Sequence, residues 1–216
     1  MNDILFLKKE KVLANRTIYI EIKGRILKSI DTLTKYFEGE RLAETCKKGC
    51  PNYGMKWSCP PFAVPFSNLA KRYTYAFLLI FSTEMKYYED IKNKYLAVKA
   101  ANVTLKSTIE KSTRDLEIVT KGYTLLSGSC RLCKPCYCKM GKPCKHPDRM
   151  RYSMEATGLN VQRLSLDFLE HELLWYKDKT LPRYTSAVTL VLYNEDFTIE
   201  NMVRNCSPLT CPVTDK

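Results

Sequence analysis

Two stretches of the chain have the apolar pattern of buried β-strands. The runs Tyr73–Ser82 and Ser186–Tyr193 are almost continuously apolar and rich in β-branched or aromatic residues, as in strands that are covered on both faces. A third stretch, Thr17–Ile22, alternates apolar and polar residues, which is typical of a half-buried strand, and Gly24 is expected to interrupt it. The pattern therefore predicts a sheet with buried central strands.

A long helical pattern lies in the middle of the chain. From Glu89 to Lys121 there is no proline or glycine, and apolar residues recur at spacings of three, four or seven. Acidic Glu89 and Asp90 favour the helix start, and Gly122 favours its end. This pattern predicts one amphipathic helix of about 50 Å, or two with a break near Asn102, packed across the sheet.

Four shorter helices are predicted around these elements. The helices span Ser29–Thr45, Ser67–Arg72, Ser153–Gly158 and Ser165–Tyr176. Gly39 weakens the first prediction, serine is the expected N-cap of the second and third, and the fourth is rich in leucine. Strands and helices in this order predict an α/β or α+β fold, with a small mixed sheet and a long amphipathic helix. We expect residues 1–216 to form a single domain, with cysteine-rich loops at 46–61 and 128–147.

The composition places the protein in a reducing compartment. The hydrophobic fraction of 45% is sufficient for an apolar core without disulfides. The N-terminal apolar run, Ile4 to Leu7, is too short for a signal peptide, and no uncharged stretch reaches the length of a membrane span. We therefore expect a cytoplasmic protein without membrane contact, in which clustered cysteines are metal ligands or redox-active groups.

The net charge of +12 raises the question of nucleic-acid binding. The basic residues are spread along the chain without a run of five, and lysine predominates over arginine. Lysines near a negatively charged metal cluster would serve a different purpose, since they offset its charge. The sequence thus does not favour specific recognition of nucleic acid.

The cysteines carry the candidate chemistry. The 10 cysteines form three groups, which are Cys46, Cys50 and Cys59; Cys130, Cys133, Cys136, Cys138 and Cys144; and Cys206 with Cys211. The middle group opens with C-x-x-C-x-x-C, the spacing with which bacterial ferredoxins hold three irons of a [4Fe–4S] cluster. A single zinc ion is instead bound by thiolates that come in well-separated pairs.

Two hypotheses about the metal bound by the middle group therefore remain, an iron–sulfur cluster and zinc. The iron–sulfur reading uses Cys144 as the fourth ligand rather than Cys138, which lies too close to Cys136 to reach a different corner and is expected to be a small buried residue. It expects Gly128 and Gly141 to let the backbone approach sulfide, and Lys134, Lys139 and Lys142 to offset charge. The alternative is zinc, bound by Cys130, Cys133, Cys144 and His146.

The first group has a less specific spacing. In CPNYGMKWSCPP, prolines follow two of the cysteines, and Tyr53 and Trp57 are expected to shield a metal centre from water. His171, in contrast, is expected to be a surface or satisfied core histidine.

The two blocks, CPNYGMKWSCPP and GSCRLCKPCYCKMGKPCKHPDRMRYSMEATGLNV, resemble the signature blocks of a family of predicted metal-binding proteins, domain of unknown function 2284. The resemblance covers Cys46 to Val161. It implies metal or cluster binding and matches the family pattern at Cys46, Cys50, Cys59, Cys130, Cys133, Cys136, Cys144, His146, Pro147, Ser153, Met154, Glu155 and Gly158. Cys138, Cys206 and Cys211 lie outside that pattern.

The sequence accordingly predicts a protein with one or two [4Fe–4S] clusters, held by Cys46, Cys50 and Cys59 and by Cys130, Cys133, Cys136 and Cys144. It would be an electron-transfer protein with a redox partner, or a cluster-dependent enzyme with an open iron site and a small-molecule substrate. The rival hypothesis is a zinc-stabilised binding module, for which the basic charge would suit nucleic acid. No phosphate-binding or nucleophile motif decides whether the protein is an enzyme, and no signal indicates its oligomeric state.

Overall fold

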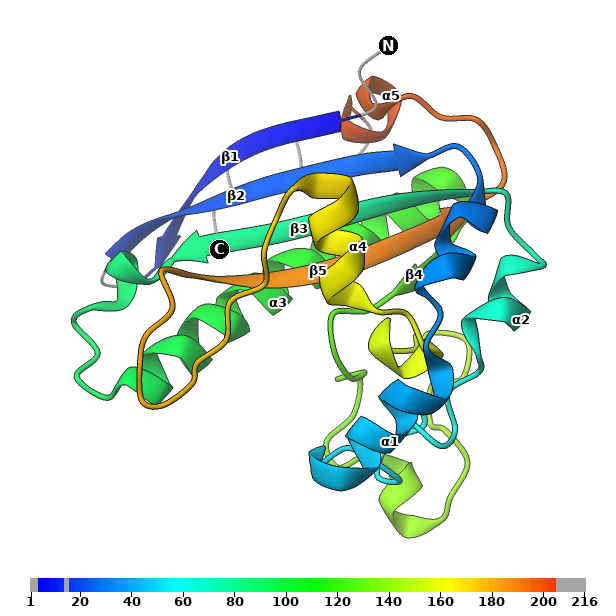
Figure 1. Ribbon diagram of the computed structural model, residues 1–216, viewed down its shortest axis with the longest axis horizontal. Helices are drawn as coiled ribbons and strands as arrows, with labels where there is room; N and C mark the ends of the chain where they lie inside the picture. Colours follow the sequence, from blue (N-terminus) through cyan, green and yellow to red (C-terminus); the bar gives the residue numbers. More distant parts are fainter. Residues whose placement is uncertain (1–3, 14–15, 205–216) are drawn as a thin grey trace.

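The fold is built on a five-stranded sheet with strand order β1-β2-β3-β5-β4. The computed structural model describes residues 4–13 and 16–204. Its strands are β1 (Ile4–Leu13), β2 (Arg16–Leu27), β3 (Tyr75–Glu84), β4 (Tyr123–Leu125) and β5 (Tyr184–Tyr193). All four pairings are antiparallel, so of the two predicted fold classes α+β applies, and the sheet is not mixed (Figure 1). Strand direction depends on how the connections run, which the apolar pattern does not encode.

The strands predicted from apolar runs are confirmed, but β2 is longer than predicted. It continues through Gly24, which pairs with Leu79 of β3 and Leu5 of β1. A Cβ atom at Gly24 would lie 2.8 Å from side-chain atoms of both Leu79 and Phe77. The prediction that Gly24 ends the strand is therefore wrong, because this glycine allows close packing inside the strand instead of breaking it.

Each face of the sheet carries its own apolar core. One core contains Phe77, Phe81 and Val191 of the sheet and packs under the long helix α3 (Lys94–Thr120). The other contains Leu78 and Leu190 and is covered by η1 (Ile30–Tyr36), α2 (Phe66–Ala70) and α4 (Val161–Leu169). Figure 1 shows α3 behind the sheet and α4 in front of it. β3 and β5 are buried because both of their faces are covered.

Helix α3 is one continuous helix of 27 residues, about 40 Å long. It begins later than predicted, because the side chain of Asn93 accepts a hydrogen bond from Leu96 N at 3.0 Å and so caps the helix. Asp90, predicted to open the helix, instead pairs with Arg16 at 2.6 Å. The predicted alternative of a break near Asn102 does not occur, and the Asn102 side chain bonds Thr185 of β5 at 2.7 Å.

The first predicted short helix is two separate elements. η1 ends before Phe37, whose backbone is extended, and α1 (Gly39–Gly49) then begins. Phe37 forms an isolated bridge with Leu159, so this contact interrupts the predicted helix from Ser29 to Thr45. Gly39 is thus the first residue of a helix rather than a weak point inside one.

The other predicted helices have different ends. α2 begins at Phe66 after Pro65, so Ser67 lies inside it and is not its cap. α4 is capped by Asn160, whose side chain accepts a hydrogen bond from Arg163 N. It ends at the left-handed backbone of Glu170. The predicted helix up to Tyr176 is therefore wrong beyond residue 169. In these cases, a capping residue or contact with another segment sets the end of the helix.

The remaining elements are short helices, among them η2 (Met85–Tyr88) after β3 and η3 (Tyr137–Met140) in the second cysteine-rich loop. η4 (Glu155–Thr157) occupies the predicted region, and Gly158 follows it with a left-handed φ of 93°. Ser153 does not cap η4, since its hydroxyl donates to the carboxylate of Glu155 at 2.7 Å. α5 (Ile199–Arg204) buries Met202 against the α3 side of the sheet. No helix among residues 4–13 and 16–204 is long and apolar enough to cross a membrane.

Candidate metal centre

The second cysteine-rich loop leaves the sheet after β4 and returns beside it. Leu126 N donates to Tyr152 O at 2.8 Å and Met154 N donates to Leu126 O at 3.0 Å, so the two ends of the loop are joined like neighbouring strands. The first loop follows α1. Figure 1 shows α1 and the second loop together below the sheet. The sheet thus provides a rigid support for both loops.

Four predicted ligands of the second block line one small pocket. The pocket is enclosed by Trp57, Ser58, Cys130, Leu132, Cys133, Cys136, Cys144, His146 and Met150. The backbone of Cys130 is fixed there, because its N–H donates to the hydroxyl of Ser58 at 2.9 Å. All four thiols are free, as is every cysteine that the structure describes. This donor set of soft sulfur ligands with one adjacent imidazole fits an iron–sulfur cluster and also fits zinc.

The three cysteines of the first block also lie close to one another. Cys46 is in the last turn of α1 and Cys50 follows the helix end, where its N–H donates to Cys46 O at 2.9 Å. Their spacing of four residues places both on one side of the helix. Cys59 lies in the turn that follows and is 5% exposed.

Electrostatic interactions connect these three thiols. The pKa of Cys59 is raised to about 11, chiefly by burial; Cys50 and Cys46 also raise it, while Ser58 and Lys56 lower it. Burial also raises the pKa of Cys46, with smaller contributions from Cys50 and from Glu155. The thiolate forms of Cys46 and Cys59 are therefore unfavourable in the protein alone, and a bound cation would supply the compensating charge.

Residues 56–58 join the two loops. Lys56 Nζ donates to Ser129 Oγ at 2.9 Å and to Cys130 O at 3.0 Å. Trp57 Nε1 donates to Lys142 O at 3.1 Å. Since Ser58 contacts Cys59 Sγ at 3.7 Å and also accepts from Cys130, a single residue touches both blocks. Trp57 also lines the pocket of the second block.

Cys138, which the family pattern omits, has a structural place. It is 8% exposed, as expected for a small buried residue, and its thiol contacts Gly54 O at 3.5 Å. Cys138 therefore holds the second loop against the first. It does not line the pocket that the other four cysteines of its block share.

Sequence reasoning missed the charged residues nearest the two blocks. Lys134, Lys139 and Lys142 of the loop are exposed. The half-buried lysines are Lys56 and Lys106, and burial lowers the pKa of Lys106, with Arg131 adding to the effect. Lys106 comes from α3, which no cysteine spacing brings to notice.

Glu155 is a second charged residue whose place depends on the tertiary structure. Its carboxylate interacts electrostatically with both Cys46 and Lys106. It belongs to the matched family pattern, but only the fold brings η4 beside α1.

The two glycines of the second loop allow backbone conformations with positive φ. Gly128 and Gly141 have φ values of 81° and 64°, in the left-handed region that glycine adopts most readily. Lys106 Nζ lies 3.3 Å from where a Cβ at Gly128 would be, while nothing lies near the same position at Gly141. The predicted role in backbone approach to sulfide is not needed to explain either residue.

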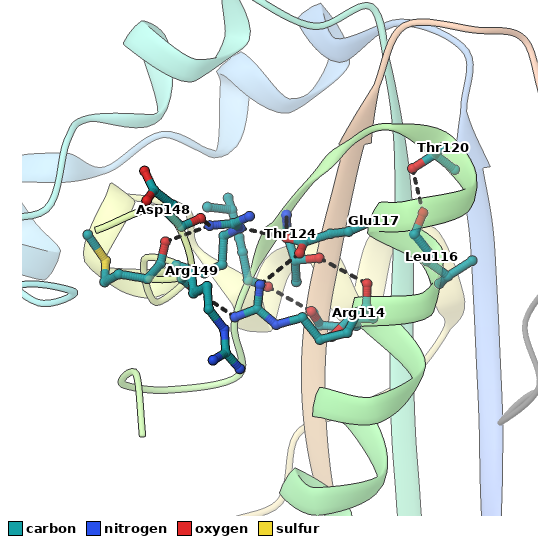
Figure 2. Close-up of polar contacts among 12 residues, drawn as sticks. Arg114, Leu116, Glu117, Thr120, Thr124, Asp148 and Arg149 are labelled. Atoms are coloured by element: carbon teal, nitrogen blue, oxygen red, sulfur yellow. Dashed lines mark hydrogen bonds and ion pairs between the residues drawn. The ribbon is translucent and has the colours of Figure 1, made fainter. Parts of the chain in front are cut away.

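A buried carboxylate fixes the chain that follows the second block. Glu117 of α3, 8% exposed, accepts hydrogen bonds from Arg114, from Arg151 and from the backbone N–H of Thr124. Arg114 also donates to Arg149 O at 2.6 Å (Figure 2). Because β4, α3 and residues 149–151 meet at one carboxylate, the loop is held at a defined place beside the sheet.

The side chains that the structure describes do not form a site for a single metal ion. In the parts of the chain that the structure describes, no group of three or more His, Cys, Asp or Glu side chains has the arrangement that would hold one metal ion. Cys206 and Cys211 lie outside the described residues.

Fold and site together define an α+β protein with two adjacent cysteine-rich loops. The chain belongs to the family of predicted metal-binding proteins DUF2284, whose profile matches residues 30–193, including both loops and the last strand. Comparisons with curated proteins and with solved structures find no match. The family resemblance deduced from the two sequence blocks is thus confirmed, and metal binding is the property by which the family is described.

Proposed function

We propose that the second block holds a [4Fe–4S] cluster through Cys130, Cys133, Cys136 and Cys144. The observation that carries this proposal is that these four thiols line one pocket, while the intervening Cys138 does not. The C-x-x-C-x-x-C run suits a cubane, in which each thiolate binds its own iron. When bound, such a cluster supplies one-electron chemistry.

The first block is proposed to hold a second metal centre with an open position. Its three neighbouring thiols, Cys46, Cys50 and Cys59, leave one ligand position for water, for a substrate or for another side chain. Glu155 is the described residue best placed to act there, since it lies near Cys46 and carries a carboxylate. Cys206 or Cys211 would close the position instead and favour electron transfer alone.

The proximity of the two blocks suggests how they work together. Ser58 touches Cys59 and Cys130, so electrons delivered to the second block would have a short path to the first. We therefore favour a cytoplasmic, cluster-dependent enzyme that receives electrons from a redox partner and acts on a small molecule at the first block. An electron-transfer protein with two closed centres is the alternative within the same class.

One observation favours a second candidate. His146 lines the same pocket as Cys130, Cys133 and Cys144, which completes a three-cysteine, one-histidine set typical of structural zinc. In that case the protein would be a zinc-stabilised binding module, and its positive charge would favour an acidic partner such as nucleic acid.

The deciding experiment is metal analysis of protein purified without oxygen. We expect a brown protein that contains iron and acid-labile sulfide in similar amounts. Mössbauer spectroscopy should resolve one iron site that responds to cyanide or a small thiol, because that iron has an open position. A colourless protein with stoichiometric zinc would refute the iron–sulfur proposal. If no iron site changed its Mössbauer spectrum when cyanide or the thiol was added, the proposed open position would be refuted.

A further inference from the structure

A hollow of about 380 Å³ lies beside the second block, between α3 and the loop. Helix α3 contributes Lys111 and Arg114, and the loop contributes Cys130, Arg131 and Arg149. This volume is in the range of about 300–1,000 Å³ that small-molecule sites occupy. The hollow adjoins the pocket of the four cysteines, because Cys130 lines both.

The charges that line the hollow are strongly unbalanced. Four cationic side chains, Lys111, Arg114, Arg131 and Arg149, face one carboxylate, Glu110. Glu110 pairs with Arg131 at 2.8 Å, and Arg114 pairs with Glu117 of the adjoining buried network at 2.8 Å. The side chains of Lys111 and Arg149 form no ion pair with any residue in the described part of the chain. Positive charge is therefore left over where the hollow opens.

One of the cationic groups, Arg114, is held in place before any ligand arrives. Arg114 bonds both Glu117 and the backbone carbonyl of Arg149, which fixes the α3 side of the hollow to the loop side. Figure 2 shows Arg114 and Arg149 next to each other, with Arg149 joined to Arg114 only through its backbone. Arginines held in this way recognise carboxylates and phosphates, because their planar N–H groups match two oxygens at once.

We propose that this hollow binds a small molecule with two or more carboxylate or phosphate groups. The unpaired Lys111 and Arg149 require more than one negative charge for neutralisation, and the volume excludes a large ligand. A molecule bound there lies against Cys130. If the proposed function is correct, this ligand is the small-molecule reaction partner of the metal centres, and that last step alone rests on the proposed function.

Calorimetric titration tests the site on the protein as isolated, whatever metal it carries. The probes are propane-1,2,3-tricarboxylate and phosphoglycolate, which separate carboxylate from phosphate recognition, with propionate as a singly charged control. We expect at least one multivalent probe to bind, and its affinity to fall at least about tenfold in the double variant Lys111→Gln/Arg149→Gln. The exposed residues Lys92, just before α3, and Lys99, near its start, provide a control: the variant Lys92→Gln/Lys99→Gln should bind normally.

A second measurement needs no variant. Phenylglyoxal modifies accessible arginines, and a bound probe should protect the peptide that contains Arg149 but not the one that contains exposed Arg204. Unchanged affinity in the Lys111/Arg149 variant, absence of protection, or binding of an acidic protein without binding of either small probe would each overturn the proposal. Metal content is read separately, so loss of the iron–sulfur assignment would leave this result standing, and the reverse also holds.

Discussion

Two regions of the molecule are stabilised in different ways. The sheet region, which comprises β2, β3, β5 and α3, is stabilised by apolar burial, and Phe77, Leu79 and Leu190 are 0% exposed. The cysteine region, residues 46–61 and 126–153, is held together by hydrogen bonds from Lys56, Trp57 and Ser58 to the facing loop. Most of its cysteines are only partly buried. Apolar stabilisation and the proposed chemistry are thus assigned to separate parts of one chain.

This difference has a thermodynamic consequence. Apolar burial contributes about 25 cal/mol per Å² whether or not a metal is bound, so the sheet should persist without it. The cysteine region contains few buried apolar residues. In the proposed function it binds the metal, and the free energy of metal binding then also stabilises the folded loops. Removing the metal should therefore disorder the loops and leave the sheet folded.

The largest expected effect concerns the sheet. Phe77→Ala should lower the free energy of unfolding by about 3–5 kcal/mol, because it removes a fully buried aromatic ring and leaves a cavity. Denaturant unfolding followed by far-UV circular dichroism measures the change, with and without chelator. Phe6→Ala, at a residue that is 66% exposed, should have little effect. A loss for Phe77→Ala that appeared only in the metal-bound protein would contradict the separation of the two regions.

The second prediction concerns the cysteine region. Cys136→Ala should remove about one cluster's worth of iron and increase amide exchange in residues 126–153, while the sheet keeps its protection. Cys138→Ala is the matched control in the same turn. It should keep its iron and lose about 1 kcal/mol, because it removes only a buried thiol and its contact with Gly54. Equal loss of iron in the two variants would show that the ligand assignment is wrong.

The two regions also differ in how far their structure follows from the sequence. The long apolar patterns predicted β3, β5 and the middle of α3, because such segments are stable only when their apolar residues are buried. The ends of the helices could not, since Asn93, Asn160 and Phe37 act through caps and a distant bridge. The prediction for Gly24 is wrong because glycine is needed there to make room for the side chain of Phe77 on the neighbouring strand.

In the cysteine region the sequence predicted the grouping of thiols but not their surroundings. Local spacing is sufficient to bring Cys130, Cys133 and Cys136 to one pocket, and Cys144, which the sequence analysis also selected, lines the same pocket. Lys106, Glu155 and Ser58 come from three different parts of the chain. Ser58 and Glu155 belong to the two signature blocks, but only tertiary packing brings Ser58 to Cys130, Glu155 to Cys46 and Lys106 to the second loop. No motif shows these contacts.

The third prediction tests the connection between the regions. Glu117→Gln should cost about 2–3 kcal/mol, because it leaves the partly buried guanidinium groups of Arg114 and Arg151 without their buried carboxylate. Amide exchange should rise at Thr124 and in residues 148–151, next to the second block. Glu110→Gln is the surface control and should cost less than about 1 kcal/mol, because this carboxylate is 40% exposed and pairs with Arg131 at the surface. Equal costs would mean that the Glu117 network does not join the two regions.

The smallest effect is a pH dependence that belongs to the sheet region alone. Burial, with a smaller contribution from Lys23, lowers the pKa of His171 to about 4, and its Nε2 bonds Ser186 Oγ at 2.7 Å. An unfolded histidine titrates near about pH 6.5, so between pH 6.5 and 4 the unfolded chain binds a proton that the folded protein does not. This contribution to stability is therefore complete above pH 6.5 and is lost as the pH falls towards 4.

We expect His171→Gln to reduce the fall in unfolding free energy over this pH range by about 1 kcal/mol, since glutamine bonds the serine without titrating. Denaturant unfolding at several pH values measures the slope. The slopes of the parent protein and of the variant should be the same after chelation, because His171 bonds Ser186 of β5. A slope that disappeared with the metal would place the pH-sensitive group in the cysteine region and break the proposed division of the molecule.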